Sequence, residues 1–119
     1  MKLTQPEWSV LEVLWSGDTF SLGEITDALA PVQGWNRKTV FTYLTRMETK
    51  GLVKIDRTQT RPYAAAVSRE VCARSERDEL LTKVYGGAAG DLIAAFLKES
   101  RISRKEVDKL RRMLDEMEV

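Results

Sequence analysis

Threonine recurs at short intervals through residues 36–50, a segment whose apolar spacing otherwise predicts a helix. Each threonine costs roughly 0.5 kcal/mol of helix stability relative to alanine. On a helical wheel the apolar residues Val40, Tyr43, Leu44 and Met47 share one side. The opposite side carries only basic residues and threonines: Lys38, Thr39, Thr42, Thr45, Arg46, Thr49 and Lys50. The segment therefore combines a buried stripe with an acid-free surface of hydrogen-bonding groups.

This surface has the chemistry that the major groove of DNA requires. Arginine and lysine donate to guanine edges or phosphates, while threonine bonds polar atoms and touches thymine through its methyl group. The amides at the start of a helix are further phosphate donors. A surface selected for solubility would pair glutamate with lysine, and no such pair occurs here. We predict a DNA recognition helix, with a solvated basic face as the alternative.

The charge distribution agrees with this prediction although the net charge is only +1. Residues 1–35 carry one basic and five acidic side chains, a net of −4. Residues 36–61 carry seven basic and two acidic side chains, a net of +5, and residues 62–119 balance at eleven of each. A positive field concentrated in one short segment is typical of a surface that meets an anionic partner.

Repeated helix-start signals define the elements that would position this surface. Thr4 with Glu7, Ser21 with Glu24 and Ser103 with Glu106 have capping-box spacing, and Asn36 is a predicted cap. The apolar spacing then predicts helices at about 4–16, 21–30, 36–50, 68–85, 88–100 and 103–117. We expect the second helix to stop before Pro31, which makes its connection to the third longer than a minimal helix-turn-helix turn.

A hairpin is predicted between the third and fourth helices. Apolar residues from Leu52 indicate a strand through about 57, a polar turn follows at 58–61, and 62–67 read as the returning strand. Arg57 and Arg61 lie beside the turn, where a wing reaches the DNA backbone or minor groove. The fold class expected is mainly α with a small β-hairpin wing, a winged helix-turn-helix domain at 1–67.

Residues 68–119 have too few large apolar groups for a comfortable core of their own. The apolar stripes of these helices would be buried best against a second copy of the chain, so we predict a three-helix dimerisation region at 68–119. The predicted contacts are Leu92, Phe96, Val107, Leu110, Leu114 and Met117. A helical cap folded onto the same chain is the alternative.

The composition disfavours an enzyme. The chain has no histidine and a single cysteine, Cys72, so neither a Cys/His metal site nor an internal disulfide can form. We expect no catalytic residues, metal, cofactor or small-molecule ligand, and a small buried Cys72. No apolar run approaches the roughly 18 residues of a membrane span, and the N-terminus does not resemble a signal peptide. These features predict a cytoplasmic protein.

The stretches WNRKTVFTYLTRMETKGLV, RPYAAAVSRE and LLTKVYGGAAGDLIAAFLKESRISRKEVDKLRRMLDE resemble the penicillinase-repressor family, which includes regulators of β-lactamase and methicillin resistance. The opening LTQPEWSVLEVLW is similar to the first helix of that family. The resemblance implies a homodimer that represses transcription from a palindromic double-stranded operator. By position it implies recognition-helix contacts by Lys38, Thr39, Thr42, Thr45 and Arg46, and a wing contact by Arg61.

In inducible members of that family, a membrane sensor-protease leads to cleavage of the dimerisation domain at an Asn-Phe peptide. The corresponding pair here is Ala95-Phe96, in which the aromatic residue matches and the asparagine does not. A different class of function stays open beside the repressor. In that alternative the winged helix docks an acidic protein partner through its basic face and binds no DNA.

Overall fold

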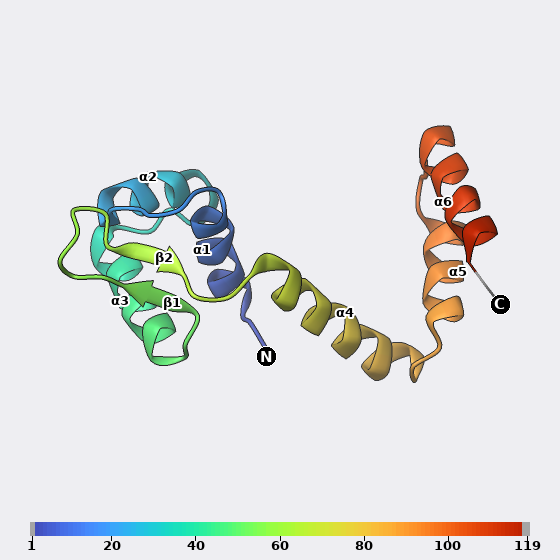
Figure 1. Cartoon of the computed structure of the whole chain (residues 1–119), viewed down its shortest axis with the longest axis horizontal. Helices are drawn as coiled ribbons and strands as arrows, with labels where there is room; N and C mark the ends of the chain where they lie inside the picture. The colour runs from blue at the N-terminus through green and yellow to red at the C-terminus, as the bar shows by residue number, and fades with distance from the viewer. Residues whose placement is uncertain (1, 118–119) are drawn as a thin grey trace. The chain divides into compact units, whose positions relative to one another are not determined.

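The computed structural model describes residues 2–117 and is mainly helical with one small antiparallel hairpin, which confirms the predicted fold class. The elements follow the predicted order (Figure 1). The helices are α1 (Gln5–Trp15), α2 (Leu22–Gln33), α3 (Arg37–Thr49), α4 (Arg69–Tyr85), α5 (Ala89–Glu99) and α6 (Arg104–Glu116). The strands β1 (Val53–Ile55) and β2 (Tyr63–Ala65) lie between α3 and α4.

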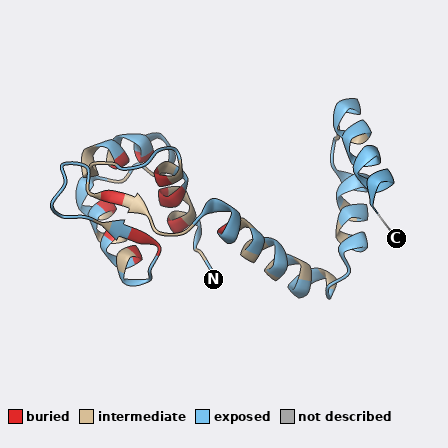
Figure 2. Cartoon of the chain, in the orientation of Figure 1, coloured by how far each residue is buried: buried red, intermediate tan, exposed pale blue. Residues whose placement is uncertain are grey.

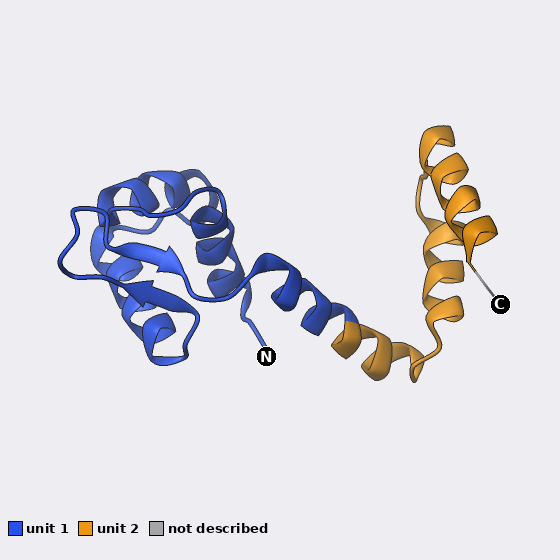
Figure 3. Cartoon of the chain, viewed as in Figure 1, with its two compact units in different colours: residues 1–77 blue, residues 78–119 orange. Residues whose placement is uncertain are grey.

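The chain divides into two compact units, Met1–Arg77 and Asp78–Val119, coloured separately in Figure 3. The first unit holds the first three helices, the hairpin and the beginning of α4, and the second holds the end of α4 with α5 and α6. The division of roles at 67/68 between DNA binding and dimerisation stays a prediction.

The helix starts form as their sequences predict. Thr4 and Glu7 close a capping box on α1, and the same reciprocal hydrogen bonds begin α2 and α6. At α3 the side-chain oxygen of Asn36 accepts a hydrogen bond from the amide of Thr39 at 2.9 Å. These caps satisfy amides that would otherwise have no partner in the first turn of each helix.

The predicted end of α2 is wrong, since the helix continues through Pro31 to Gln33. A proline in the last turn removes only one hydrogen bond, and the buried side chain of Leu29 holds this turn against the core. The helix ends at Gly34, which has a left-handed φ of 67° and donates its amide hydrogen to the carbonyl of Ala30. The turn to α3 is therefore short, contrary to the longer connection expected from sequence.

The hairpin is shorter than predicted and is joined by a third segment. β1 and β2 pair antiparallel, with Ile55 opposite Tyr63. Tyr63 also exchanges two backbone hydrogen bonds with Phe20, at 2.9 and 3.0 Å. The chain between α1 and α2 thus lies along the far edge of β2 and fixes the base of the wing to the helices.

One apolar core unites α1, α2, α3 and the hairpin, as the buried positions in Figure 2 show. Its buried members are Val10, Leu11, Leu14, Ile25, Leu29, Val40, Leu44, Met47, Leu52, Val53 and Tyr63. Fully burying an aliphatic side chain of this size stabilises a fold by about 1.5–3 kcal/mol. Cys72 is also buried, as expected, and burial raises the pKa of its thiol.

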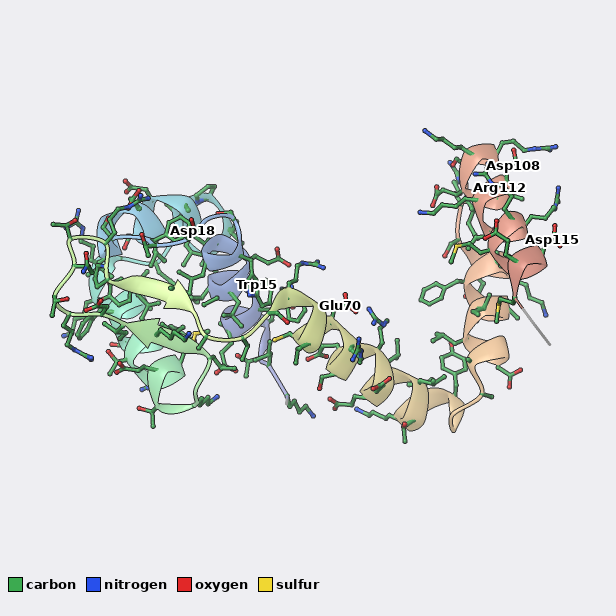
Figure 4. All side chains as sticks on the ribbon, in the orientation of Figure 1. Trp15, Asp18, Glu70, Asp108, Arg112 and Asp115 are labelled. Carbon is green, nitrogen blue, oxygen red and sulfur yellow. The ribbon has the colours of Figure 1, made fainter. Side chains whose placement is uncertain are left out.

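Trp15 on α1, labelled in Figure 4, ties this core to the segment that leads into α4. Its indole nitrogen donates to the carbonyl of Val67 at 2.9 Å. Nearby, the Arg69 guanidinium lies 5.9 Å from the Trp8 ring and 3.3 Å from a carboxylate oxygen of Glu12. The first turn of α4 is therefore attached to α1 by both polar and aromatic contacts.

The second unit is built differently, because α5 and α6 contain no buried residue among those described. Large apolar side chains remain exposed on both helices, Phe96 at 55% and Leu114 at 61% among them. A small groove of about 160 Å³ lies in this unit, lined by Leu97, Val107, Leu110, Arg111 and Leu114.

The Asn36 cap yields a stability prediction. Replacing Asn36 by alanine leaves the amide of Thr39 without its acceptor, and we expect a loss of about 1 kcal/mol in the free energy of unfolding, measured by urea denaturation. Replacing Asn36 by serine supplies another good capping oxygen and is expected to cost much less. Equal destabilisation by alanine and serine would show that the cap does not stabilise α3.

Candidate nucleic-acid interface

Helix α3 has one buried and one exposed side, as the wheel predicts. Val40, Leu44 and Met47 are fully buried against α1, α2 and the hairpin. The residues of the opposite side are exposed or half-buried: Lys38, Thr39, Thr42, Thr45, Arg46, Thr49 and Lys50. Phe41 adds a 50% exposed aromatic ring beside this surface. Tyr43 is half-buried, and its ring stacks on that of Trp35 with centroids 4.4 Å apart.

The threonine hydroxyls on this surface are already partly engaged. Those of Thr42 and Thr45 each donate to the carbonyl four residues earlier, at 2.9 Å, and that of Thr49 does so at 3.3 Å. A hydroxyl bonded in this way keeps its acceptor lone pair and its methyl group for an external partner. The surface therefore presents threonine acceptors and methyl groups between basic donors.

Lys38 and Arg46 are the two basic residues on this surface that keep their charge uncompensated. Within the described part of the chain, neither is ion-paired with a carboxylate. Both side chains are exposed, one in the first turn of α3 and the other in its second half. On this surface they are the cations most available to an anionic ligand.

The wing arginines, by contrast, are held by carboxylates of the two preceding helices. Arg57 forms a bidentate pair with Glu48 of α3, with both nitrogen–oxygen distances 3.0 Å. Arg61 forms a second bidentate pair with Glu24 of α2, both at 2.8 Å. The sequence predicts these arginines beside the wing turn but does not reveal their partners, which lie 9 and 37 residues away along the chain.

These pairs shift the ionisation of the carboxylates. Arg61, followed by the backbone amide of Ser21, lowers the pKa of Glu24 to about 2. Hydrogen bonds from Arg57 similarly lower the pKa of Glu48. The guanidinium pKa values rise in return, so both pairs are fully ionised at neutral pH.

Lys50, the last of the predicted contacts, also has a partner within the protein. Its amino group lies 2.6 Å from a carboxylate oxygen of Glu7 in α1. Glu7 is 4% exposed, whereas the Lys50 side chain is 55% exposed. Among residues 2–117, the predicted cations thus fall into two without an ion-pair partner, Lys38 and Arg46, and three that pair with carboxylates of α1, α2 or α3.

Other kinds of site find little support in the described residues. Between residues 2 and 117, no group of three or more His, Cys, Asp or Glu side chains could hold a metal ion. No single described helix is both long and apolar enough to cross a membrane. Helices α4 and α5 meet that test only together, as a bent pair, and by length and composition alone.

Three helices followed by an antiparallel hairpin, with the third helix exposing one polar side, define a winged helix-turn-helix protein. The chain belongs to the penicillinase repressor family, which it matches over residues 3–116. Its relatives include penicillinase repressors and methicillin resistance regulatory proteins, and the family resemblance noted in the sequence is confirmed.

Three similar proteins illustrate the family. The methicillin resistance regulatory protein MecI of Mammaliicoccus sciuri is 24% identical over 116 residues, which cover 96% of this chain and 94% of that protein. The penicillinase repressor of Staphylococcus aureus is 24% identical over 118 residues, 98% of this chain and 94% of that protein. The penicillinase repressor of Bacillus licheniformis is 22% identical over 116 residues, 97% of this chain and 91% of that protein.

Among solved structures, a MarR/EmrR family transcriptional regulator from Acinetobacter sp. ADP1 aligns with a TM-score of 0.47 and 22% identity. The alignment covers 97% of this chain and 78% of that one.

The Arg61–Glu24 pair predicts a specific acid titration. Because the pKa of Glu24 in the folded protein is about 2, below its ordinary 4.5, the pair stabilises the fold above about pH 4.5 and loses this effect as pH falls toward 2. Replacing Arg61 by alanine is expected to raise the pKa of Glu24 toward 4.5, measured by carbon-13 NMR of the side-chain carboxyl. Replacing Arg69, which pairs with Glu12, provides a matched control and should leave the Glu24 titration unchanged. An unaltered Glu24 titration in the Arg61 variant would contradict the pair.

Proposed function

We propose that this protein is a dimeric, sequence-specific transcriptional repressor that acts in the cytoplasm on a palindromic operator. The observation that carries the proposal is the exposed side of α3, which is free of acidic side chains and includes unpaired Lys38 and Arg46. Membership of a family of repressors supports the same function. A palindrome follows from two-fold symmetry, since each subunit of a dimer presents the same helix to one half-site.

The side chains of α3 divide the work of recognition in this proposal. Arg46 donates to a guanine edge, and Lys38 to a base or phosphate near the start of the helix. The hydroxyls of Thr42 and Thr45 already donate within the helix, so they accept from base amino groups or place their methyl groups against thymine. Thr39 stands in the first turn, where its amide is already capped by Asn36 and its side chain faces the same groove.

The wing has a supporting part in this arrangement. Arg57 and Arg61 are 67% and 52% exposed, so each can exchange its carboxylate partner for a phosphate of the DNA backbone. Exposed ion pairs are weak in water, so such an exchange requires little free energy. In the absence of DNA the same pairs hold the wing beside α3 and α2, and thus limit the conformational freedom lost on binding.

The second unit supplies the dimer contacts in this proposal. Leu92 and Val107 are half-buried, and Phe96, Leu110, Leu114 and Met117 are exposed by 38–64%. Apolar side chains at this density on two neighbouring helices indicate a surface that another copy covers. Joining two winged helices raises operator affinity because the second half-site binds as an intramolecular step.

Release from the operator would follow from loss of the dimer. Ala95 and Phe96 lie inside α5, so a protease that cuts between them requires local opening of this helix. Gly86 and Gly87 precede α5 with left-handed φ values of 58° and 88°, and provide a point where opening can begin. We propose that a signal from a membrane sensor-protease leads to this cut, which would separate α6 from α4 and end bivalent binding.

The DNA-binding role predicts measurable losses in α3 variants. Replacing Arg46 or Thr42 by alanine is expected to cost about 1–3 kcal/mol of operator affinity if the residue reads a base. The measurement is a gel shift with duplex from the protein's own upstream region against random duplex. Replacing Lys98, an exposed lysine of α5, removes a charge far from α3 in sequence and is the control.

Full operator affinity in the Thr42/Arg46 double variant would contradict the assignment. Equal, weak binding of both duplexes by the wild type would favour an acidic protein partner.

The dimer surface predicts a different outcome. Placing aspartate at Leu110 buries a charge in the proposed interface, so we expect monomers by analytical ultracentrifugation and a steep loss of operator binding. Arg112→Asp makes a comparable change on the opposite side of α6, where Arg112 is exposed (Figure 4), and should remain dimeric. A dimeric Leu110→Asp variant would place the interface elsewhere.

A further inference from the structure

Glu7 is a buried carboxylate at the junction of α1 and the recognition helix. It is the one charged side chain among the described residues that is buried, with 4% exposure. One carboxylate oxygen accepts the amide hydrogen of Thr4 at 2.9 Å, and the other accepts from the amino group of Lys50 at 2.6 Å. Both oxygens therefore have partners, and each partner belongs to a different part of the fold.

The bond to Lys50 connects the first turn of α1 to the C-cap of α3, while the bond to Thr4 lies within the cap of α1. Glu7 closes the α1 capping box, while Lys50 is the residue that ends α3 and donates its amide hydrogen to the carbonyl of Arg46. Burial opposes the charged form of Glu7, but hydrogen bonds from Lys50 and Thr4 outweigh it and lower its pKa. Replacing Lys50 would leave the buried charge of Glu7 without this partner, so the pair favours close approach of the two helix ends.

A cleft of about 270 Å³ lies beside this pair. Its lining residues are Thr4, Pro6, Glu7, Tyr43, Arg46 and Lys50. Arg46, one of the two unpaired cations of the exposed side of α3, forms part of the same wall one helical turn before Lys50. The Glu7–Lys50 pair therefore lies beside the turn of α3 that carries Arg46.

We propose that Glu7 is a positioning residue for DNA recognition, and that Lys50 acts on binding by holding α3 through Glu7 rather than by contacting a phosphate. The inference rests on the proposed function and changes the role expected of Lys50 from sequence. It also accounts for the presence of a carboxylate close to the proposed DNA-binding surface. Its charge is neutralised by Lys50 and is buried away from solvent.

The alternative is that Glu7 only neutralises Lys50 in the free protein, and that Lys50 leaves Glu7 to contact a phosphate when DNA binds. The two readings predict opposite results for Glu7→Gln, a variant that keeps an acceptor for the Thr4 amide and loses the charge. A positioning role predicts about a tenfold loss of operator affinity, with unchanged affinity for random duplex. The slope of log affinity against log salt concentration should also be unchanged. Neutralisation alone predicts tighter binding to every duplex and a slope steeper by about 0.9.

The experiment measures operator and random-duplex affinity by fluorescence anisotropy at several salt concentrations, using the full-length protein. The variants are Glu7→Gln, Lys50→Met and the double variant, with circular dichroism and thermal unfolding to confirm that each is folded. We expect either single change to lower operator affinity and the double change to be no worse than Lys50→Met. Glu12→Gln removes an equal charge from an exposed position of α1 and is the matched control, expected to behave as wild type.

Several results would overturn the inference. The first is wild-type operator affinity in the Glu7→Gln variant, and the second is tighter binding of this variant to all duplexes. The third is a salt-dependence slope reduced in magnitude by about 0.9 when Lys50 is replaced in the wild type or in the Glu7→Gln variant. If Lys50→Met does not fold, the sign of the Glu7→Gln effect and its salt slope still decide between the two readings. Failure of the wild type to prefer operator over random duplex would instead overturn the proposed function itself.

Discussion

The packing of α3 against α1, α2 and the hairpin is the interaction on which the rest of the first unit depends. Val40, Leu44 and Met47 can be buried only if the opposite side of the same helix faces outward, because an α-helix repeats every 3.6 residues. The orientation of the polar side is therefore a consequence of core packing. Threonine weakens α3 locally, and the Asn36 cap together with burial of this stripe compensates.

Ion pairs determine which basic residues near this surface have a carboxylate partner within the protein. Glu48, Glu24 and Glu7 come from three different helices, and each forms an ion pair with one basic residue of the wing or of the end of α3. The two exposed pairs connect the wing to α3 and α2 by contacts that are weak in water. The third pair joins the buried Glu7 of α1 to Lys50 at the end of α3, and loss of Lys50 would leave the Glu7 charge in a poorly solvated place. The same chemical interaction thus has two uses that depend on burial.

The second unit follows a different logic. Its helices have apolar stripes but no buried residues among those described, so a single chain leaves much of this surface in water. In the proposed dimer, association removes this apolar surface from water and so stabilises the second unit. Stability and operator affinity would then depend on the same contacts. Control of repression through the second unit, by whatever signal, would act on that shared dependence.

The sequence by itself determined the local features. The three capping boxes, the Asn36 cap, the order of elements, the buried stripe of α3 and the family follow from spacing within a few residues or from extended similarity. The end of α2 did not follow, because whether Pro31 stops a helix depends on the buried Leu29 and on the left-handed Gly34 beyond it. Only the tertiary structure decided that Lys50, Arg57 and Arg61 meet carboxylates 43, 9 and 37 residues away in sequence. Charge and periodicity show which residues are polar and outward-facing, but an ion pair requires two side chains to meet in space, and that meeting is set by how the helices and wing pack.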